Sequence, residues 1–110
     1  MFSFRKKKEN TPAYRREMAR RLNGKHLKYV TERLPDGESV IGRSGALIVR
    51  DGELLVYASA DVVFRCEVQK LQMSELLSME GVILTGEDAA HENRLRTVIA
   101  YYTYYRNVEN

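Results

Sequence analysis

The first apolar residues after the opening of the chain have a helical spacing. Tyr14, Met18 and Leu22 recur every four positions, which places them on one face of an amphipathic helix over residues 12–23. A Thr-Pro dipeptide begins this stretch and favours a helix start, because threonine can cap and proline fits the first turn. A helix this short is not stable alone in water, so its apolar face is expected to pack against its own domain.

After residue 24 the apolar residues follow a period of two, which is typical of strands. Turn residues such as Asp36 and Gly37 separate these stretches. Gly42 and Gly45 interrupt the second stretch and predict a bulge or a sharp bend there. Strands are expected within residues 25–34, 39–50, 53–58, 62–69, 81–88 and 94–106.

The clearest local pattern is a hairpin centred on Asp51 and Gly52, a dipeptide that suits a two-residue type I′ turn. Such a turn sets four pairs opposite one another: Arg50–Glu53, Val49–Leu54, Ile48–Leu55 and Leu47–Val56. The first of these is expected to form a cross-strand ion pair. Both faces of the hairpin are apolar, which favours a strongly curled sheet or one covered by a helix.

The stretch 62–69 alternates cleanly, with one side formed by Val62, Phe64, Cys66 and Val68. Cys66 is the sole cysteine, so the chain has no internal disulfide and no thiolate metal site. Its place on the apolar side of a strand predicts an inert core thiol rather than a nucleophile.

Two segments allow a helical interpretation. Residues 70–81 break the alternation, and their leucines and Met79 suit a short inserted helix that Gly81 would end. In the last segment, Leu95, Val98, Ile99 and Tyr102 also fit a helical stripe. A strand is favoured for the last segment because threonine, valine, isoleucine and tyrosine dominate it.

These elements predict a mainly β, α+β fold: a small curled antiparallel sheet or barrel of about six strands with one helix before it and one inserted. The arrangement resembles small barrels of the Sm/SH3 kind, and equally the pleckstrin-homology type, which would favour a final helix. No signature residue of either family stands at a diagnostic place, so no site residue carries over. A mobile basic tail over residues 1–10 is expected to precede one domain over residues 11–110.

Charge divides the chain unevenly. The first 28 residues hold ten basic and two acidic side chains, and the remaining 82 hold eight basic and thirteen acidic ones. A basic arm of this kind can bind an anionic lipid surface, which the neighbouring Phe2 and Phe4 would enter. It can also bind RNA or DNA backbone phosphates, fold back on the acidic body, or remain a solvated tail. The candidate polyanion-binding residues are Arg5, Lys6, Lys7, Lys8, Arg16 and Arg20.

Four tyrosines near the end of the chain are the candidate interface: Tyr101, Tyr102, Tyr104 and Tyr105. In a strand, successive side chains point to opposite faces, so two rings would face the interior and two would face elsewhere. The rings can pack in the core, form a protein or subunit interface, or stack on nucleic-acid bases.

The sequence predicts no catalytic, cofactor-binding or metal-binding residue. His26 and His91 lack metal-ligand spacing, and the glycines form no phosphate-binding loop. We therefore expect a non-enzymatic interaction or structural module of a bacterial cytoplasm, without a cofactor or a small-molecule substrate. A protein partner or a homo-oligomer is the first expectation, and a polyanion bound through the basic arm is the alternative.

Overall fold

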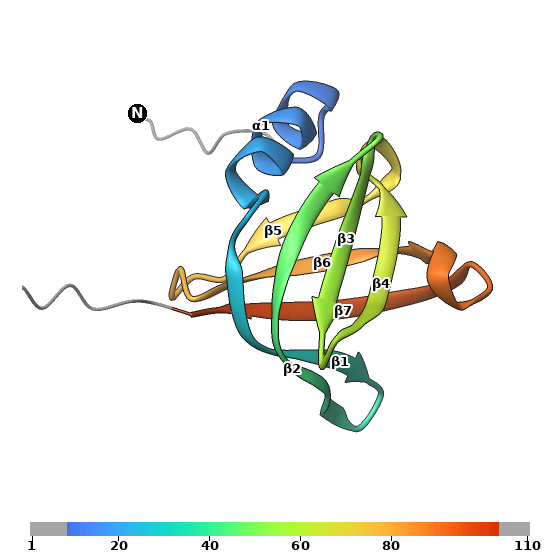
Figure 1. Cartoon of the computed structure of the whole chain (residues 1–110). Coiled ribbons are helices and arrows are strands. Elements are labelled where there is room, and N and C mark those ends of the chain that lie inside the picture. The colour runs from blue at the N-terminus through green and yellow to red at the C-terminus, as the bar shows by residue number, and fades with distance from the viewer. Residues whose placement is uncertain (1–8, 104–110) are drawn as a thin grey trace, which may run out of the picture.

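A computed structural model of the chain describes residues 9–103 (Figure 1). The predicted helix is confirmed as α1 (Pro12–Leu22). Its start is capped as expected, because Thr11 Oγ1 accepts a hydrogen bond of 3.1 Å from the Tyr14 N–H. After the helix, Gly24 takes a φ of +90°, a left-handed conformation that costs glycine little.

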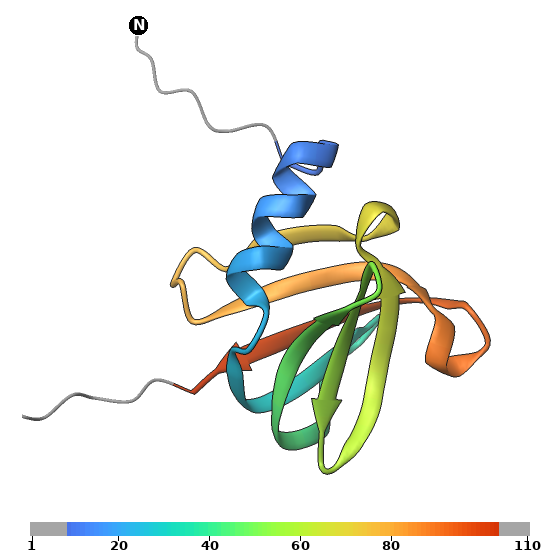
Figure 2. The same ribbon diagram turned by 45° about the horizontal axis from the view of Figure 1, so that its top comes forward.

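The rest of the described chain is mainly β. One antiparallel sheet contains seven strands in the order β4-β3-β2-β1-β7-β6-β5, and it curls into a half-barrel (Figures 1 and 2). The prediction of about six strands is thus one strand short. Two 3-10 turns, η1 (Val68–Lys70) and η2 (Ala89–His91), connect strands. The strands are β1 (His26–Leu34), β2 (Gly37–Arg50), β3 (Glu53–Ala58), β4 (Asp61–Glu67), β5 (Gln72–Glu75), β6 (Gly81–Asp88) and β7 (Arg94–Tyr102).

The register of the β2–β3 hairpin is confirmed at all four predicted pairs. Asp51 and Gly52 have φ values of 53° and 78°, as a type I′ turn requires. The predicted ion pair between Arg50 and Glu53 is wrong. Arg50 Nη2 instead lies 3.4 Å from the Tyr57 hydroxyl, and a carboxylate oxygen of Glu53 lies 3.5 Å from Arg65 Nε on β4.

Strand β2 is continuous, so its predicted interruption is wrong, but the predicted bulge is confirmed. Val30 of β1 lies opposite Gly42 and the next residue of β1 lies opposite Val40, which leaves Ile41 as the extra residue. Gly45 lies where β2 pairs with both β1 and β3. A Cβ atom there would lie 1.7 Å from the carbonyl oxygen of Tyr57, so the close approach of β2 and β3 requires a glycine.

The predicted inserted helix over residues 70–81 is wrong. Its centre is the short strand β5, in which Met73 lies opposite Leu84 of β6, and both are fully buried. A turn follows, closed by hydrogen bonds from Met79 N to Leu76 O and from Leu76 N to Gly81 O. The leucines that suggested a helical stripe are divided between this turn and the core, because pairing with β6 decides the local conformation.

Strand β7 confirms the strand interpretation of the last segment up to Tyr102. It pairs with both β1 and β6, which a helix could not do. Its side chains alternate as predicted, since Val98, Ala100 and Tyr102 face the interior and are buried. Residues 104–106 of the predicted strand lie outside the described residues.

The core lies inside the curl of the sheet. The most buried large side chains come from nearly every strand and include Phe64, Leu47, Leu54, Leu84 and Val98. Helix α1 covers one end of the half-barrel (Figure 2) and packs its buried Met18, Ala19 and Leu22 towards η1, β2 and β5. In the described range, no helix has the length and apolar content to cross a bilayer.

Candidate functional site

A buried carboxylate lies where β4 approaches the end of β6. Asp88 is fully buried, and four donors satisfy its oxygens. Its Oδ1 accepts from the N–H groups of Arg65 (3.1 Å) and Ala90 (2.9 Å). Its Oδ2 lies 2.7 Å from His91 Nδ1 and accepts from Arg96 Nη1. The Asp88 carboxylate therefore binds the Arg65 N–H, a backbone donor at the edge of β4 that a neighbouring strand would otherwise bind.

Arg96 joins this carboxylate to two further strands. Its Nε and Nη2 donate to both carboxylate oxygens of Glu32 on β1, at 3.0 and 2.9 Å. Its Nη1 also donates to the carbonyl oxygen of Val63 on β4, at 3.0 Å. We call Asp88, Arg96 and Glu32 the seam network, because they link the open side of the half-barrel. Sequence reasoning missed this network, although period-two counting places Asp88 and Arg96 on interior faces.

The charges of the seam network stabilise one another. Burial would raise the pKa of Asp88, but hydrogen bonds from Arg96, from two backbone N–H groups and from His91 outweigh it, so the pKa is lowered. The hydrogen bond from Arg96 lowers the pKa of Glu32 despite partial burial. The same bond raises the pKa of Arg96. All three groups are therefore charged at neutral pH.

Stability is expected to fall in acid through the seam network. Because folding lowers the pKa of both Asp88 and Glu32, their contribution is complete above the ordinary carboxyl values of about 4 and is lost as the pH falls through the lowered folded values. Urea unfolding of wild type and of Asp88→Asn at several pH values measures this. The difference in free energy of unfolding should shrink in acid. A difference that does not vary with pH would contradict the assignment.

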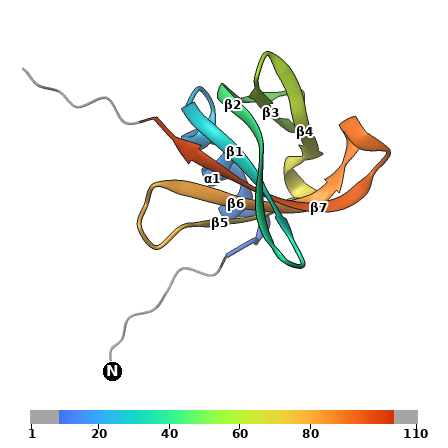
Figure 3. The same cartoon turned by 90° about the horizontal axis from the view of Figure 1, so that it is seen from below.

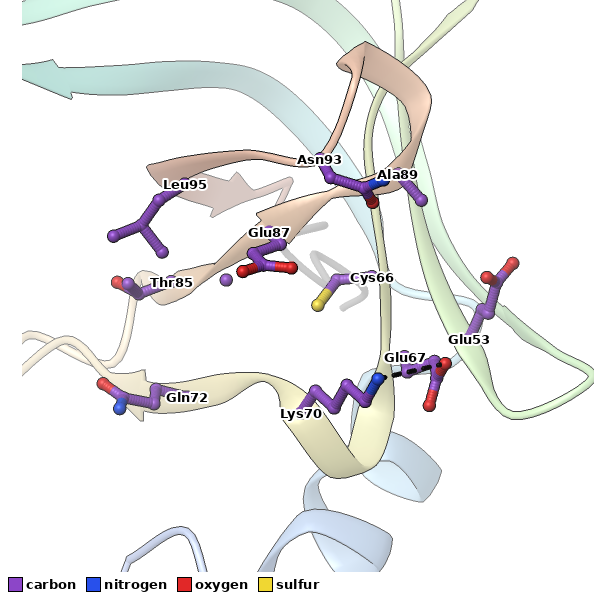
Figure 4. A pocket seen from close by; sticks show the side chains of 11 residues that line it. Glu53, Cys66, Glu67, Lys70, Gln72, Thr85, Glu87, Ala89, Asn93 and Leu95 are labelled. Carbon is purple, nitrogen blue, oxygen red and sulfur yellow. Dashed lines mark ion pairs between the residues drawn. The ribbon is translucent and has the colours of Figure 1, made fainter.

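Beside the seam network lies a pocket of about 450 Å³ between β4, η1 and β6 (Figure 4). The Cys66 thiol and the Glu87 carboxylate lie between β4 and β6. At the η1 side of the pocket, Lys70 Nζ lies 3.8 Å from a carboxylate oxygen of Glu67. Burial raises the pKa of Cys66, which keeps the thiol protonated. The prediction that this thiol is buried is confirmed. No group of three or more histidine, cysteine or acidic side chains among residues 9–103 could hold a metal ion.

Two of the predicted polyanion-binding residues lie within the described chain. Arg16 and Arg20 are exposed on α1 and border a shallow groove of about 510 Å³ whose floor includes Val49 and Val68. Arg20 pairs with Glu17 at 2.6 Å, so its charge is partly neutralised. The other candidates, Arg5, Lys6, Lys7 and Lys8, lie outside the described residues.

The structure separates the predicted interface tyrosines. Tyr102 is buried and its hydroxyl donates to Glu75 at 3.1 Å, so its ring offers no surface to a partner. Tyr101 lies on the opposite face, where its ring centroid is 4.7 Å from that of Tyr29 and its hydroxyl donates to Glu38 at 3.1 Å. The remaining candidates, Tyr104 and Tyr105, lie outside the described residues.

Tyr101 belongs to a continuous surface on the outside of the curled sheet. Cross-strand pairs place Tyr29 beside Tyr101, and Thr85 beside Thr97 with 2.9 Å between their hydroxyl oxygens. Leu95 is 74% exposed at one end of this surface. Aliphatic, aromatic and threonine side chains form most of it, and charged side chains lie among and beside them: Arg43 is opposite Tyr29, Glu87 is opposite Leu95, and Glu38 accepts a hydrogen bond from Tyr101. The outer face, as we call it, comprises the partly exposed Tyr29, Val40, Ile83, Thr85, Leu95, Thr97 and Tyr101, together with Thr31 and Ile99, which their neighbours bury.

Side chains also cover the other edge of the sheet, at β5. The Met73 N–H donates to Asn10 Oδ1 at 2.8 Å, and the Met73 carbonyl accepts from the Tyr14 hydroxyl at 3.0 Å. The sequence placed Asn10 in a mobile tail, whereas it contacts this strand. At each edge of the sheet, side chains thus bond two backbone groups that could otherwise pair with another chain.

Compared with protein-family models, with curated proteins and with solved structures, the chain matches none of them.

Proposed function

We propose that the chain is a non-enzymatic interaction module that binds a protein partner, in the first instance a second copy of itself, through the outer face. The observation that carries the proposal is the composition of this face. Leu95 and Val40 are 74% and 46% exposed there, and half-buried aromatic and β-branched side chains lie between them, with Ile99 and Thr31 buried beneath. Large exposed apolar surfaces rimmed by polar residues mark interaction sites.

The coverage of the sheet edges supports the outer face over a sheet edge as the docking surface. Addition of a strand requires free backbone N–H and C=O groups on an edge. On β4, side chains occupy the Arg65 N–H and the Val63 carbonyl, and on β5 they occupy both backbone groups of Met73. A partner strand would have to displace these side chains before it could pair with the backbone of either edge.

The chemistry of the pocket supports a non-enzymatic role. Its thiol, Cys66, has a raised pKa, whereas a nucleophilic cysteine needs a lowered one. The carboxylates of Glu53 and Glu67 have cationic neighbours at 3.5 and 3.8 Å.

We keep the cytoplasm as the expected location. Of the two small-barrel resemblances, we favour the pleckstrin-homology type, because consecutive hairpins build the sheet, although the helix stands before the strands and not after them.

Self-association is expected to depend on Leu95. The change Leu95→Glu places a charge on the outer face, and it should weaken dimerisation at least about tenfold, because the interface must then desolvate a charge in place of an apolar side chain. Size-exclusion chromatography with light scattering over a range of concentrations measures this. Leu77→Glu is the matched control, since Leu77 is fully exposed but lies on the β5–β6 turn. A wild-type chain that remains monomeric throughout would contradict the proposal.

A further inference from the structure

The turn between β5 and β6 presents apolar side chains to solvent. Leu77 is fully exposed and Met79 is 57% exposed, although a leucine gains about 1.5–3 kcal/mol from burial. The turn has a defined shape, because Met79 takes a φ of +67° and its N–H donates to Leu76 O at 2.8 Å. The conformation of the turn therefore keeps Leu77 and Met79 away from the core, and we call these two residues the tip.

Basic side chains gather at the same end of the half-barrel. The carbonyl of Glu80, in the turn, accepts from the Tyr102 N–H at 2.9 Å, which brings the turn to the end of β7. Lys25 Nζ lies 5.0 Å from the centre of the Tyr102 ring, and Lys28 Nζ lies 5.9 Å from that of Tyr29. Neither lysine forms an ion pair with any residue that the structure describes. Figure 3 shows the turn projecting on the side where β7 ends.

The first described residues, Glu9 and Asn10, lie beside β5, the strand that leads into this turn. Ser74 of β5 donates to a carboxylate oxygen of Glu9 at 3.3 Å, and Asn10 contacts Met73. Arg21 also lies here but pairs with Glu75 at 3.2 Å, so Lys25 and Lys28 supply the positive charge of this end.

We propose that this end of the molecule binds the surface of an anionic lipid bilayer, with Leu77 and Met79 entering the boundary between headgroups and acyl chains. Reversible membrane binding combines buried apolar groups with attraction of basic residues to anionic lipid, and both are present here. Nucleic acid fits less well, because sequence-tolerant binders of single strands stack bases on aromatic rings, and the exposed tip is aliphatic. This proposal does not rest on the self-association proposed above.

Co-sedimentation of the full chain with vesicles tests the proposal. Vesicles of equimolar phosphatidylserine and phosphatidylcholine should bind the chain, and vesicles of phosphatidylcholine alone should bind it weakly. The double change Leu77→Ser with Met79→Ser keeps the charge and should weaken binding at least about tenfold. Lys25→Gln with Lys28→Gln should weaken it about 30-fold. Leu95→Glu, on the outer face, is the control and should leave binding unchanged.

Three outcomes would overturn the proposal. The first is no preference of the wild-type chain for phosphatidylserine. The second is binding that persists undiminished in the Leu77/Met79 double variant, because the arm alone would then explain it. The third is tighter binding to a single-stranded oligonucleotide, lost in the Lys25/Lys28 variant and insensitive to the tip.

Fluorescence gives a second readout that does not depend on loss of binding. The chain contains no tryptophan, so Leu77→Trp introduces a single probe at an exposed position. Its emission should move to shorter wavelength with phosphatidylserine vesicles, while the matched probe Leu95→Trp should not change. An unchanged emission from the probe at position 77 would place the tip in water and overturn the proposal.

Discussion

Replacing Arg96 with methionine is expected to lower the free energy of unfolding by about 3–5 kcal/mol, as removal of one partner from a buried charge pair does. The change leaves Asp88 charged and buried, with no cation to offset its desolvation. It also removes the donor to the Val63 carbonyl and both hydrogen bonds to Glu32. Urea denaturation followed by far-ultraviolet circular dichroism measures the loss.

Arg94→Met is the matched control for this experiment. Arg94 begins the same strand but is exposed, so its replacement should change the free energy of unfolding by no more than about 0.5 kcal/mol. Equal and small effects of the two substitutions would show that the seam network does not hold β4 to β6.

Gly45→Ala is expected to cost about 3 kcal/mol, at the upper end of the range for overpacked sites. The new Cβ would lie 1.7 Å from the Tyr57 carbonyl oxygen. Because the neighbour is backbone, relief requires β2 and β3 to separate, and their pairing would weaken. Ser39→Ala, at an exposed position of the same strand, is the control. If Gly45→Ala were as stable as wild type by the same urea titration, the close approach of the strands would be wrong.

Features determined by local chemistry could be predicted from the sequence. The cap by Thr11 depends on a side chain and an N–H three residues apart. The β2–β3 register depends on Asp51 and Gly52, which can adopt the left-handed backbone that the turn requires. The alternation through Phe64 and Cys66 reflects a strand with one buried side. None of these depends on knowing which distant segment lies nearby.

Features decided by distant partners were predicted poorly. Strand β5 has only four residues, too few for periodicity to distinguish it from a helix, and its pairing with β6 decides the matter. Glu53 lies near Arg65 rather than Arg50 because β4 lies on the other side of β3. The sequence of the β2–β3 hairpin alone does not show that β4, with Arg65, lies beside it.

The seam network could be predicted only in part. Counting by twos from Val82 places Asp88 on the interior face of β6, and counting back from Val98 places Arg96 on that of β7. The sequence thus indicates two opposite charges facing the core from adjacent strands. It does not show that Glu32, 64 residues before Arg96, completes the set, because that depends on β1 pairing with β7.

The central claim is that side chains cover both edges of the sheet and leave the outer face for a partner. Native-state hydrogen exchange at the backbone amides of Arg65 and Met73 tests it most directly. Both amides point away from their own ladders and donate to buried or half-buried side chains, so we expect them to exchange as slowly as amides paired between strands. Exchange at the rate of free surface amides would contradict the claim, because the edges would then be open to another strand.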